Sequence, residues 1–176
     1  EDGTLPRLVP EDRRAWHAGV ACWRGVQDVN GRSVGIELVN PGHEFGYRPF
    51  PEAQIATLQD LCHAILARHP IPARNVVGHA DVAPGRKQDP GELFPWQRLA
   101  AAGIGLWPGD GADPLPADRV EEALTALGYC PELAPPAERI AAFQRHFRPQ
   151  RVDGTADAET RARLAALLAE PGADGP

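Results

Sequence analysis

Apolar residues recur at helical spacing in one segment of the first half of the chain and in three segments of the second half. The first segment opens after Pro51, which can start a helix, and Pro70 and Pro72 end it. Its apolar stripe comprises Ile55, Leu58, Leu61, Cys62, Ile65 and Leu66. A shorter amphipathic stretch follows at 94–102. Further helices are predicted at 118–127, which ends at Gly128, and at 137–147 and 157–168.

Two segments have the features of strands. Residues 33–40 alternate between apolar and other side chains, with three apolar residues on one face and Glu37 on the opposite face. Residues 75–79 form a short apolar run that is predicted to deliver His79 at the C-terminal end of a buried strand, where ligands gather in open α/β sheets. The first part of the chain is therefore predicted to be α/β, and the last part all-α with three helices.

The chain divides at a segment that is rich in glycine, proline and aspartate and has no periodic pattern. A three-helix module of about sixty residues is marginal in size but can fold alone. We predict a first domain at 1–104, a linker at 105–116, a small three-helix domain at 117–170 and a tail at 171–176.

Composition and charge narrow the function classes. The 176 residues carry a formal net charge of −6, which argues against nucleic acid as a partner because there is no basic field to bind it. No apolar run approaches the length of a membrane-spanning helix. The three cysteines form no Cys-x-x-Cys pair and permit at most one disulfide, so they leave the redox compartment open. We expect a monomer.

Lys87 is the only lysine among the 18 lysine and arginine residues, and it lies between two candidate metal ligands. A compact ammonium differs from a planar guanidinium, so Lys87 is a candidate for stabilising the oxyanion that forms when a carbonyl is attacked. His79 and Asp89 offer nitrogen and oxygen donors that are compatible with zinc. Glu37 is a candidate general base. Alternatively, Lys87 is a solvated loop residue and Glu37 is a rim carboxylate paired with an arginine.

A catalytic zinc site needs three protein ligands and an open position for water, and spacing alone does not identify the third ligand. His17 could be that ligand, a substrate contact or a histidine that is satisfied within its own loop. The remaining histidines have no acidic or histidine partner at ligand spacing and are assigned to the surface or the core; they are His43, His63, His69 and His146.

Four motifs occur in an order that resembles a known family. They are Trp16-His17-Ala18-Gly19, Ser33-Val34-Gly35-Ile36-Glu37, the stretch 75–91 with Gly78-His79-Ala80-Asp81 and Lys87-Gln88-Asp89-Pro90-Gly91, and Leu93-Phe94-Pro95-Trp96. Together they resemble the zinc-dependent N-acetylmuramoyl-L-alanine amidases of the amidase_2 type, which are related to peptidoglycan recognition proteins. The likeness is greatest to the outer-membrane lipoprotein amidases of Gram-negative bacteria. Segments 142–149 and 153–160 resemble a peptidoglycan-binding three-helix domain.

This resemblance implies a mixed sheet flanked by helices, followed by the small all-α domain. It also implies a role for each candidate residue. His79 and Asp89 would be zinc ligands, Glu37 the proton acceptor, and Lys87 the residue that stabilises the transition state. These roles agree with the chemistry that the residue types suggest.

By the same resemblance, His17 would line the substrate cleft rather than bind metal, and Trp16 and Arg24 would also contact substrate. The chain departs from the family at one point. The first zinc-binding histidine of the family lies on an early strand that aligns upstream of Glu1. We therefore expect the third ligand, that strand and any lipoprotein signal to precede Glu1.

The expected activity is zinc-dependent hydrolysis of the amide bond between N-acetylmuramic acid and L-alanine in peptidoglycan. The expected location is the periplasm, with an outer-membrane anchor supplied by the upstream signal. The C-terminal helices would hold the enzyme on its polymeric substrate. The alternatives are a peptidoglycan-binding protein without catalysis, a cytoplasmic amidase that recycles soluble muropeptides, and an incomplete, inactive fragment. Glu37 and Lys87 weigh against the first alternative, and the wall-binding module weighs against the second.

Overall fold

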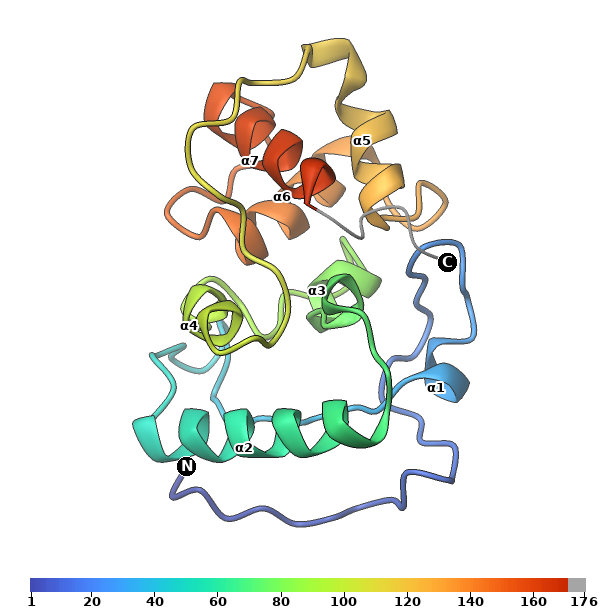
Figure 1. Cartoon of the computed structure of the whole chain (residues 1–176), viewed down its shortest axis with the longest axis vertical. Helices are drawn as coiled ribbons and strands as arrows, with labels where there is room; N and C mark the ends of the chain where they lie inside the picture. The colour runs from blue at the N-terminus through green and yellow to red at the C-terminus, as the bar shows by residue number, and fades with distance from the viewer. Residues whose placement is uncertain (171–176) are drawn as a thin grey trace.

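The computed structural model describes residues 1–170, and the predicted tail at 171–176 lies outside the described residues. Helices and loops make up the described part of the chain (Figure 1). In chain order the helices are α1 (Val29–Arg32), α2 (Glu52–Arg68), the 3-10 turn η1 (Ala73–Asn75), α3 (His79–Val82), α4 (Trp96–Ala101), the 3-10 turn η2 (Ala117–Arg119), α5 (Val120–Leu127), α6 (Pro136–Phe147) and α7 (Ala158–Ala169).

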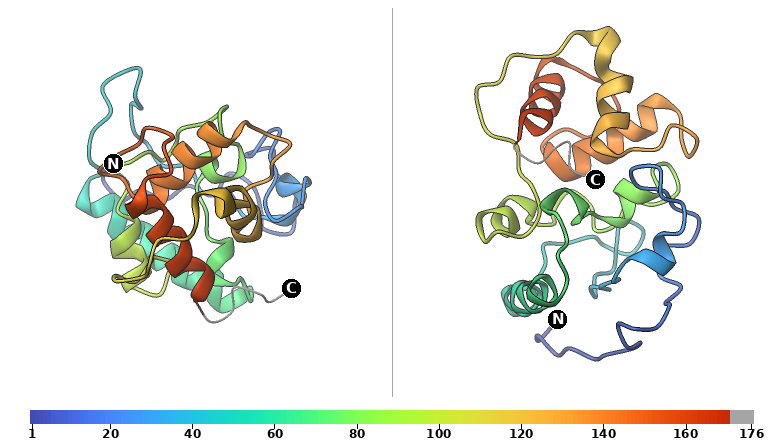
Figure 2. Two further views of the ribbon diagram at one scale, coloured as in Figure 1. Left: turned by 90° about the horizontal axis from the view of Figure 1, so that it is seen from above. Right: turned by 45° about the vertical axis from the view of Figure 1, so that its right-hand side comes forward.

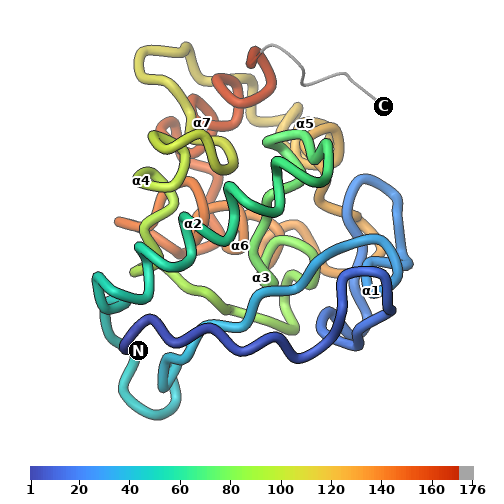
Figure 3. The backbone as a smooth tube through the Cα atoms, turned by 60° about the horizontal axis from the view of Figure 1, so that its bottom comes forward, coloured from blue at the N-terminus to red at the C-terminus, as the bar shows by residue number. Residues whose placement is uncertain are grey.

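The helices lie at three levels along the long axis of the molecule. Helix α2 lies at one end, α3 and α4 lie in the middle, and α5, α6 and α7 gather at the other end (Figure 1 and Figure 2). The N-terminal residues run alongside α2 as an extended trace (Figure 3). Thr57 Oγ1 donates a hydrogen bond to the Gly3 carbonyl (3.1 Å), and Arg68 forms an ion pair with Glu11 (2.6 Å). These contacts hold the trace along the helix.

The predicted α/β fold with a mixed sheet is wrong for residues 1–170, which contain two isolated bridges at Trp23 but no β-strand. Residues 33–40 carry the alternating pattern, yet they form no ladder. A strand requires hydrogen bonds to a neighbouring strand, and that neighbour is usually distant in sequence. Val34 and Ile36 remain 38% and 37% exposed, as expected of an extended segment that no neighbouring strand covers. The alternation thus indicated an extended backbone, but it could not supply the partner.

The predicted strand that ends at His79 is also wrong. Asn75 closes η1, and His79 is the first residue of α3 rather than the last residue of a strand. The Gly78 N–H donates to the Asp81 carboxylate (2.7 Å), which caps the turn and favours a helix at this point. The short helix α1 was not predicted either; the Asp28 side chain caps it by accepting the Gly31 N–H (3.2 Å).

The predictions based on helical spacing are confirmed. The long helix after Pro51 is α2, with Ile55, Leu58 and Ile65 buried, and it ends two residues before Pro70. The amphipathic stretch at 94–102 contains α4. Each of the three C-terminal helices lies within two residues of its predicted bounds, with η2 forming the first turn before α5.

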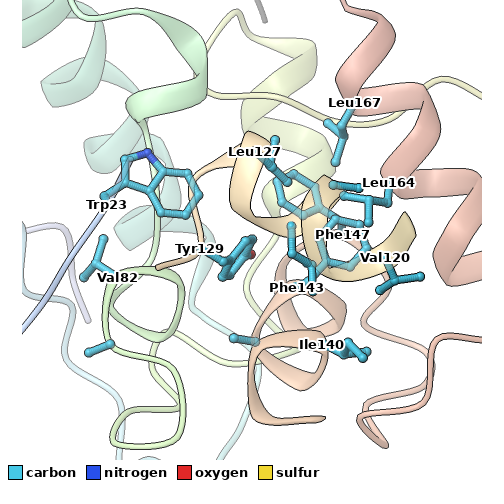
Figure 4. Packing of buried hydrophobic residues seen from close by; sticks show 14 of the residues in the cluster. Trp23, Val82, Val120, Leu127, Tyr129, Ile140, Phe143, Phe147, Leu164 and Leu167 are labelled. Carbon is cyan, nitrogen blue, oxygen red and sulfur yellow. The ribbon is translucent and has the colours of Figure 1, made fainter. Parts of the chain in front are cut away.

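Two clusters of buried apolar residues hold these elements together. The smaller cluster joins α2 to α4 and comprises Ile55, Leu58, Phe94, Trp96, Leu99 and Ile104. The larger cluster joins α5, α6 and α7, but it also includes Trp23 and Val82 from the first part of the chain (Figure 4). Its apolar packing therefore crosses the predicted linker, and the division into two domains stays a prediction.

A disulfide between Cys22 and Cys130 crosses the same boundary. The two Cα atoms are 5.9 Å apart, and 108 residues separate the cysteines in sequence. The Cys22 N–H also donates to the Val82 carbonyl (2.8 Å) at the end of α3. This hydrogen bond connects α3 to the segment that carries the disulfide. Cys62 is a free, half-buried thiol on α2, and burial raises its pKa. In the part of the chain that the structure describes, no helix is both long enough and apolar enough to span a bilayer.

The disulfide makes a prediction about stability. Cross-linking a loop of this length lowers the entropy of the unfolded chain by an amount worth up to about 5 kcal/mol at room temperature in the chain-entropy account. We expect a Cys22→Ala/Cys130→Ala variant to unfold at a lower denaturant concentration than the oxidised protein. Reductant should shift the oxidised protein toward the same midpoint. Cys62→Ala should respond to reductant as the parent protein does, and equal midpoints with and without reductant would contradict the prediction.

Candidate active site

A cavity of about 790 Å³ lies between residues 33–40, α2 and the start of α3. Apolar side chains of α2, including Leu58 and Ile65, line one side of it. Predicted site residues from three separate segments also line it: His17, Glu37, His79, Lys87 and Asp89. The structure therefore brings the two candidate ligands, the candidate base and the candidate cation to one cavity. Trp16 and Arg24 lie outside its lining.

His79 and Asp89 form a close pair in this cavity. The His79 Nδ1 atom lies 3.0 Å from Asp89 Oδ2, and His79 Nε2 lies 3.0 Å from the Ala18 carbonyl oxygen. Burial by itself would raise the pKa of the Asp89 carboxyl. The hydrogen bond and charge of His79, together with the nearby Lys87, outweigh burial and lower that pKa. Asp89 is therefore held as a carboxylate, the form that can bind a cation.

The donor set fits part of a zinc site. An imidazole nitrogen and a carboxylate oxygen are both zinc donors, and here they lie close enough to share one ion. Within residues 1–170, however, no group of three or more His, Cys, Asp or Glu side chains is placed to hold a metal. His17 accordingly does not complete such a group, although it lines the same cavity. The assignment of His79 and Asp89 as zinc ligands stays a prediction.

Glu37 and Lys87 both line this cavity. Glu37 is exposed and Lys87 is partly buried. Among the described residues, neither side chain takes part in an ion pair or a hydrogen bond, so Glu37 is not the arginine-paired carboxylate of the alternative interpretation. A carboxylate and an ammonium that both line one cavity are available to a bound substrate. Their catalytic roles stay predictions.

His17 is held by the segment that carries Glu37. Its Nε2 atom lies 2.8 Å from Ser33 Oγ, and Ser33 in turn donates to the Val29 carbonyl (2.7 Å). The Ser33 proton is therefore donated to Val29, so His17 Nε2 is the donor to Ser33 Oγ. A Cβ at Gly35 would lie 2.5 Å from the His17 ring, so only glycine fits beside it. His17 Nδ1 is buried and has no hydrogen-bond partner in the described chain.

The other two predicted substrate residues lie elsewhere. Trp16 is 79% exposed, and the Arg14 guanidinium lies over its ring, 4.5 Å from the centroid. Arg24 has a positive φ of 51°, and its N–H donates to the Gly128 carbonyl (2.9 Å). Their contact with substrate stays a prediction.

Two residues that the sequence did not single out shape the site. Tyr47 donates its hydroxyl to the Pro90 carbonyl (2.7 Å) and accepts the Leu93 N–H (2.9 Å), which holds the loop that follows Asp89. A Cβ at Gly91 would clash with the Tyr47 hydroxyl oxygen, so the loop approaches the ring closely. No spacing rule links Tyr47 to a loop more than forty residues away, because that contact exists only in the fold.

Arg86 is the second such residue. Its Nη2 atom donates to the carbonyls of Ala18 (2.6 Å) and Val20 (2.8 Å), and it lies 3.4 Å from His79 Nε2. Gly19 must be glycine here, because its φ is 63° and a Cβ would lie 3.2 Å from the guanidinium. Arg86 therefore fixes the loop that faces His79. The only signal in the sequence was its position beside Lys87.

Comparisons with known proteins identify the family of this chain. The family Amidase_2, described as N-acetylmuramoyl-L-alanine amidase, matches residues 1–92. The chain belongs to this family and is an amidase. It is 46% identical over 188 residues to the N-acetylmuramoyl-L-alanine amidase AmiD of Escherichia coli (strain K12), covering 96% of this chain and 68% of AmiD. It is 41% identical over 100 residues to the 1,6-anhydro-N-acetylmuramyl-L-alanine amidase AmpD of Enterobacter cloacae, spanning 57% of this chain and about half (51%) of AmpD.

Solved structures show the same likeness. The complex of E. coli AmiD with the substrate anhydro-N-acetylmuramic acid-L-Ala-D-gamma-Glu-L-Lys superposes with a TM-score of 0.85, at 42% identity, and covers 98% of this chain and 78% of that one. AmpDh3 from Pseudomonas aeruginosa gives a TM-score of 0.83 at 40% identity, with 92% and 71% coverage. Both matches extend past residue 92, so they include the C-terminal helices.

The environment of the two tyrosines yields a prediction about pH. Burial and the nearby Glu92 raise the pKa of Tyr47 to about 12, and burial together with Asp81 raises the pKa of Tyr129 well above 10. An unfolded chain loses these protons near pH 10, so the native state should lose stability as the pH rises from about 10 to about 12.

Ultraviolet titration of tyrosinate tests this, because Tyr47 and Tyr129 are the only tyrosines. The native protein should show no tyrosinate at a pH of about 10, whereas protein unfolded in guanidinium should titrate there. A Tyr129→Phe variant isolates Tyr47, which should titrate near 12. Native titration of either residue near 10 would contradict the burial described here.

Proposed function

We propose that this amidase hydrolyses the amide bond between the lactyl group of N-acetylmuramic acid and the L-alanine of the stem peptide. The observation that carries the proposal is that Glu37, His79, Lys87 and Asp89 line one cavity, in a chain that belongs to the amidase family. The AmiD complex supports the substrate class, because it contains an anhydro-muramyl peptide with this bond. The cavity offers both apolar and polar lining for a sugar-peptide substrate.

We further propose that zinc is the cofactor and that His79 and Asp89 hold it, with a third ligand from outside the described residues. Their separation of 3.0 Å supports this. A bound zinc ion would act as a Lewis acid and lower the pKa of a water molecule to about 7. The protein side chains then carry the remaining steps.

Each remaining step has a side chain in the cavity. Glu37 accepts the proton of the attacking water and passes it to the leaving amine nitrogen. Lys87 donates a hydrogen bond to the oxygen that becomes negatively charged when the carbonyl is attacked. His17 lines the cavity and contacts the substrate, and Trp16 and Arg24 contact it beyond the cavity. Among the described residues neither Glu37 nor Lys87 takes part in an ion pair, which supports these roles, since an ion pair would have to be broken before either could act.

Substitutions test the roles separately. In the enzyme as its gene encodes it, Glu37→Gln or Lys87→Met should leave zinc bound and lower the turnover number by about 10²- to 10⁴-fold, the range for losing a general base or an oxyanion donor. Release of L-Ala-containing peptide from a soluble muropeptide measures this. Lys87→Arg should not restore the rate, because the planar guanidinium of arginine does not replace the compact ammonium of lysine. Glu132→Gln, at an exposed site outside the cavity, is the matched control. A Glu37→Gln enzyme with normal turnover would refute the base assignment.

The metal assignment has its own test. His79→Ala and Asp89→Ala should each lower zinc content and abolish hydrolysis, whereas Glu37→Gln should retain zinc. Metal analysis of the purified proteins, together with treatment by a chelator and readdition of zinc, measures the difference. Full zinc content in both the His79→Ala and Asp89→Ala proteins would exclude these residues as ligands.

We also propose that the enzyme works in the periplasm, where its C-terminal helices hold it on peptidoglycan. The Cys22–Cys130 disulfide supports an oxidising compartment over the cytoplasm. The match to AmiD over 96% of this chain, against 57% for AmpD, supports a shared role for the C-terminal part. An outer-membrane anchor upstream of Glu1 belongs to the same proposal.

Binding of the inactive Glu37→Gln protein to purified sacculi tests this role. If the helices contact the polymer, saturating soluble muropeptide should displace only part of the bound protein, because a second contact remains. Complete displacement would mean that the catalytic cavity alone binds the wall. The non-catalytic alternative makes a different prediction: sacculi would bind the parent protein and never be cleaved by it.

A further inference from the structure

A buried carboxylate on helix α3 connects that helix to the C-terminal part of the chain. Asp81, on α3, is 1% exposed. Its Oδ1 atom accepts the Tyr129 hydroxyl (2.5 Å), and its Oδ2 atom accepts both His146 Nδ1 (2.7 Å) and the Gly78 N–H (2.7 Å). Since an ionised carboxylate can only accept, Nδ1 of His146 carries the proton. Donors from three segments thus meet on one side chain.

The two side-chain donors are themselves fixed by packing. Tyr129 is fully buried, and its ring lies edge-on to Trp23, with centroids 5.2 Å apart. The His146 ring is stacked between Trp96 at 3.7 Å and Phe147 at 3.8 Å. His146 Nε2 is buried and has no hydrogen-bond partner among residues 1–170. Among the described residues, the His146 ring therefore makes one polar contact, from Nδ1 to Asp81, while its Nε2 atom is buried without a partner.

Helix α3 connects the hydrogen bonds of Asp81 to the two candidate zinc ligands, His79 and Asp89. His79 directly follows Gly78, whose N–H is bound by Asp81. The Ala80 N–H donates to the Asp89 carbonyl (2.8 Å), which links the backbone of the second candidate ligand to α3. A Cβ at Gly78 would lie 2.8 Å from Pro90, so the two segments are in close contact. A shift of α3 would therefore displace both His79 and Asp89.

We propose that Tyr129 and His146 are positioning residues for the amidase site. Through Asp81 they hold α3 where His79 and Asp89 face each other across 3.0 Å. The inference rests on the proposed function for its kinetic readout, and it assigns the C-terminal helices a part in catalysis as well as in binding polymer. Misplacing reacting groups by about 1 Å can cost about 10²-fold in rate. A modest shift of α3 would therefore be measurable.

Single substitutions remove each donor with little change of shape. Tyr129→Phe keeps the ring, and His146→Leu keeps much of the apolar bulk. On a soluble muropeptide, which needs no polymer contact, each should lower kcat about 10-fold to 100-fold and change KM by less than about 2-fold. His146→Asn places an amide N–H near the position of Nδ1, so it should recover most of the lost kcat. A role confined to stability would not produce this recovery.

Gln144→Leu is the matched control. Gln144 is also fully buried on α6, but its side chain bonds only to Asp153, Gly154, Thr155 and Thr160, within the C-terminal part. It should lower the melting temperature as much as His146→Leu does and leave kcat unchanged. All kinetics are measured well below the melting temperature of each variant, so that every enzyme is folded.

A second readout keeps this inference separate from the proposed function. Nuclear magnetic resonance of the histidine rings reports the environment of His79 without any substrate, and His79→Ala assigns its signals. The His79 signals should shift in Tyr129→Phe and His146→Leu and stay in place in Gln144→Leu. Unmoved His79 signals and normal kcat in both donor variants would overturn the inference. If the parent protein hydrolyses no muropeptide, the proposed function fails, and the ring signals still decide the positioning role.

Discussion

The carboxylate of Asp81 is the contact on which the site depends, because burying it is costly unless every donor is present. An ionised carboxylate removed from water loses several kcal/mol of hydration free energy. Hydrogen bonds to a charged group each return about 1.5 to 3 kcal/mol. The three hydrogen bonds to Asp81 therefore act together against the cost of burying it. Gly78, Tyr129 and His146 act as a set.

These hydrogen bonds contribute to a difference between the two sides of the cavity, because the α3 side is held by many more contacts than residues 33–40. On the α3 side, the largest apolar cluster, the disulfide and the Asp81 hydrogen bonds converge. On the opposite side, residues 33–40 form no ladder, and Val34, Ile36 and Val39 are partly or largely exposed. The candidate ligands thus lie on the firmly held side, and the candidate base Glu37 lies on the other. Ligands need a fixed geometry, which the firmly held side of the cavity provides.

The sequence predicted what depends on local spacing and missed what depends on distant partners. Helix α2 and the three C-terminal helices follow from the period of their apolar residues, which is set within one or two turns. The sheet was wrong because residues 33–40 carry a strand-like pattern without a strand to pair with in the described chain. The strand predicted to end at His79 was wrong because the side chain of Asp81 caps a helix there.

The same distinction holds within the site. The order of the motifs identified four candidate site residues, and all four line one cavity: Glu37, His79, Lys87 and Asp89. The supporting contacts were not predictable in this way. Tyr47 reaches Pro90 across 43 residues, and His146, assigned from its spacing only to surface or core, reaches Asp81 across 65. No local pattern encodes such pairs.

The adjacent residues Arg86 and Lys87, the only lysine of the chain, differ in their contacts beside the site. The Arg86 guanidinium donates to two carbonyls of the 18–20 loop at once, a structural task that suits a planar group with several N–H donors. Lys87 takes part in no ion pair within the described residues and lines the cavity. If position 87 also carried a guanidinium, its extra N–H donors would lie near Asp89, the carboxylate that His79 now contacts. A single compact charge leaves those contacts intact and stays available to an oxygen of the substrate.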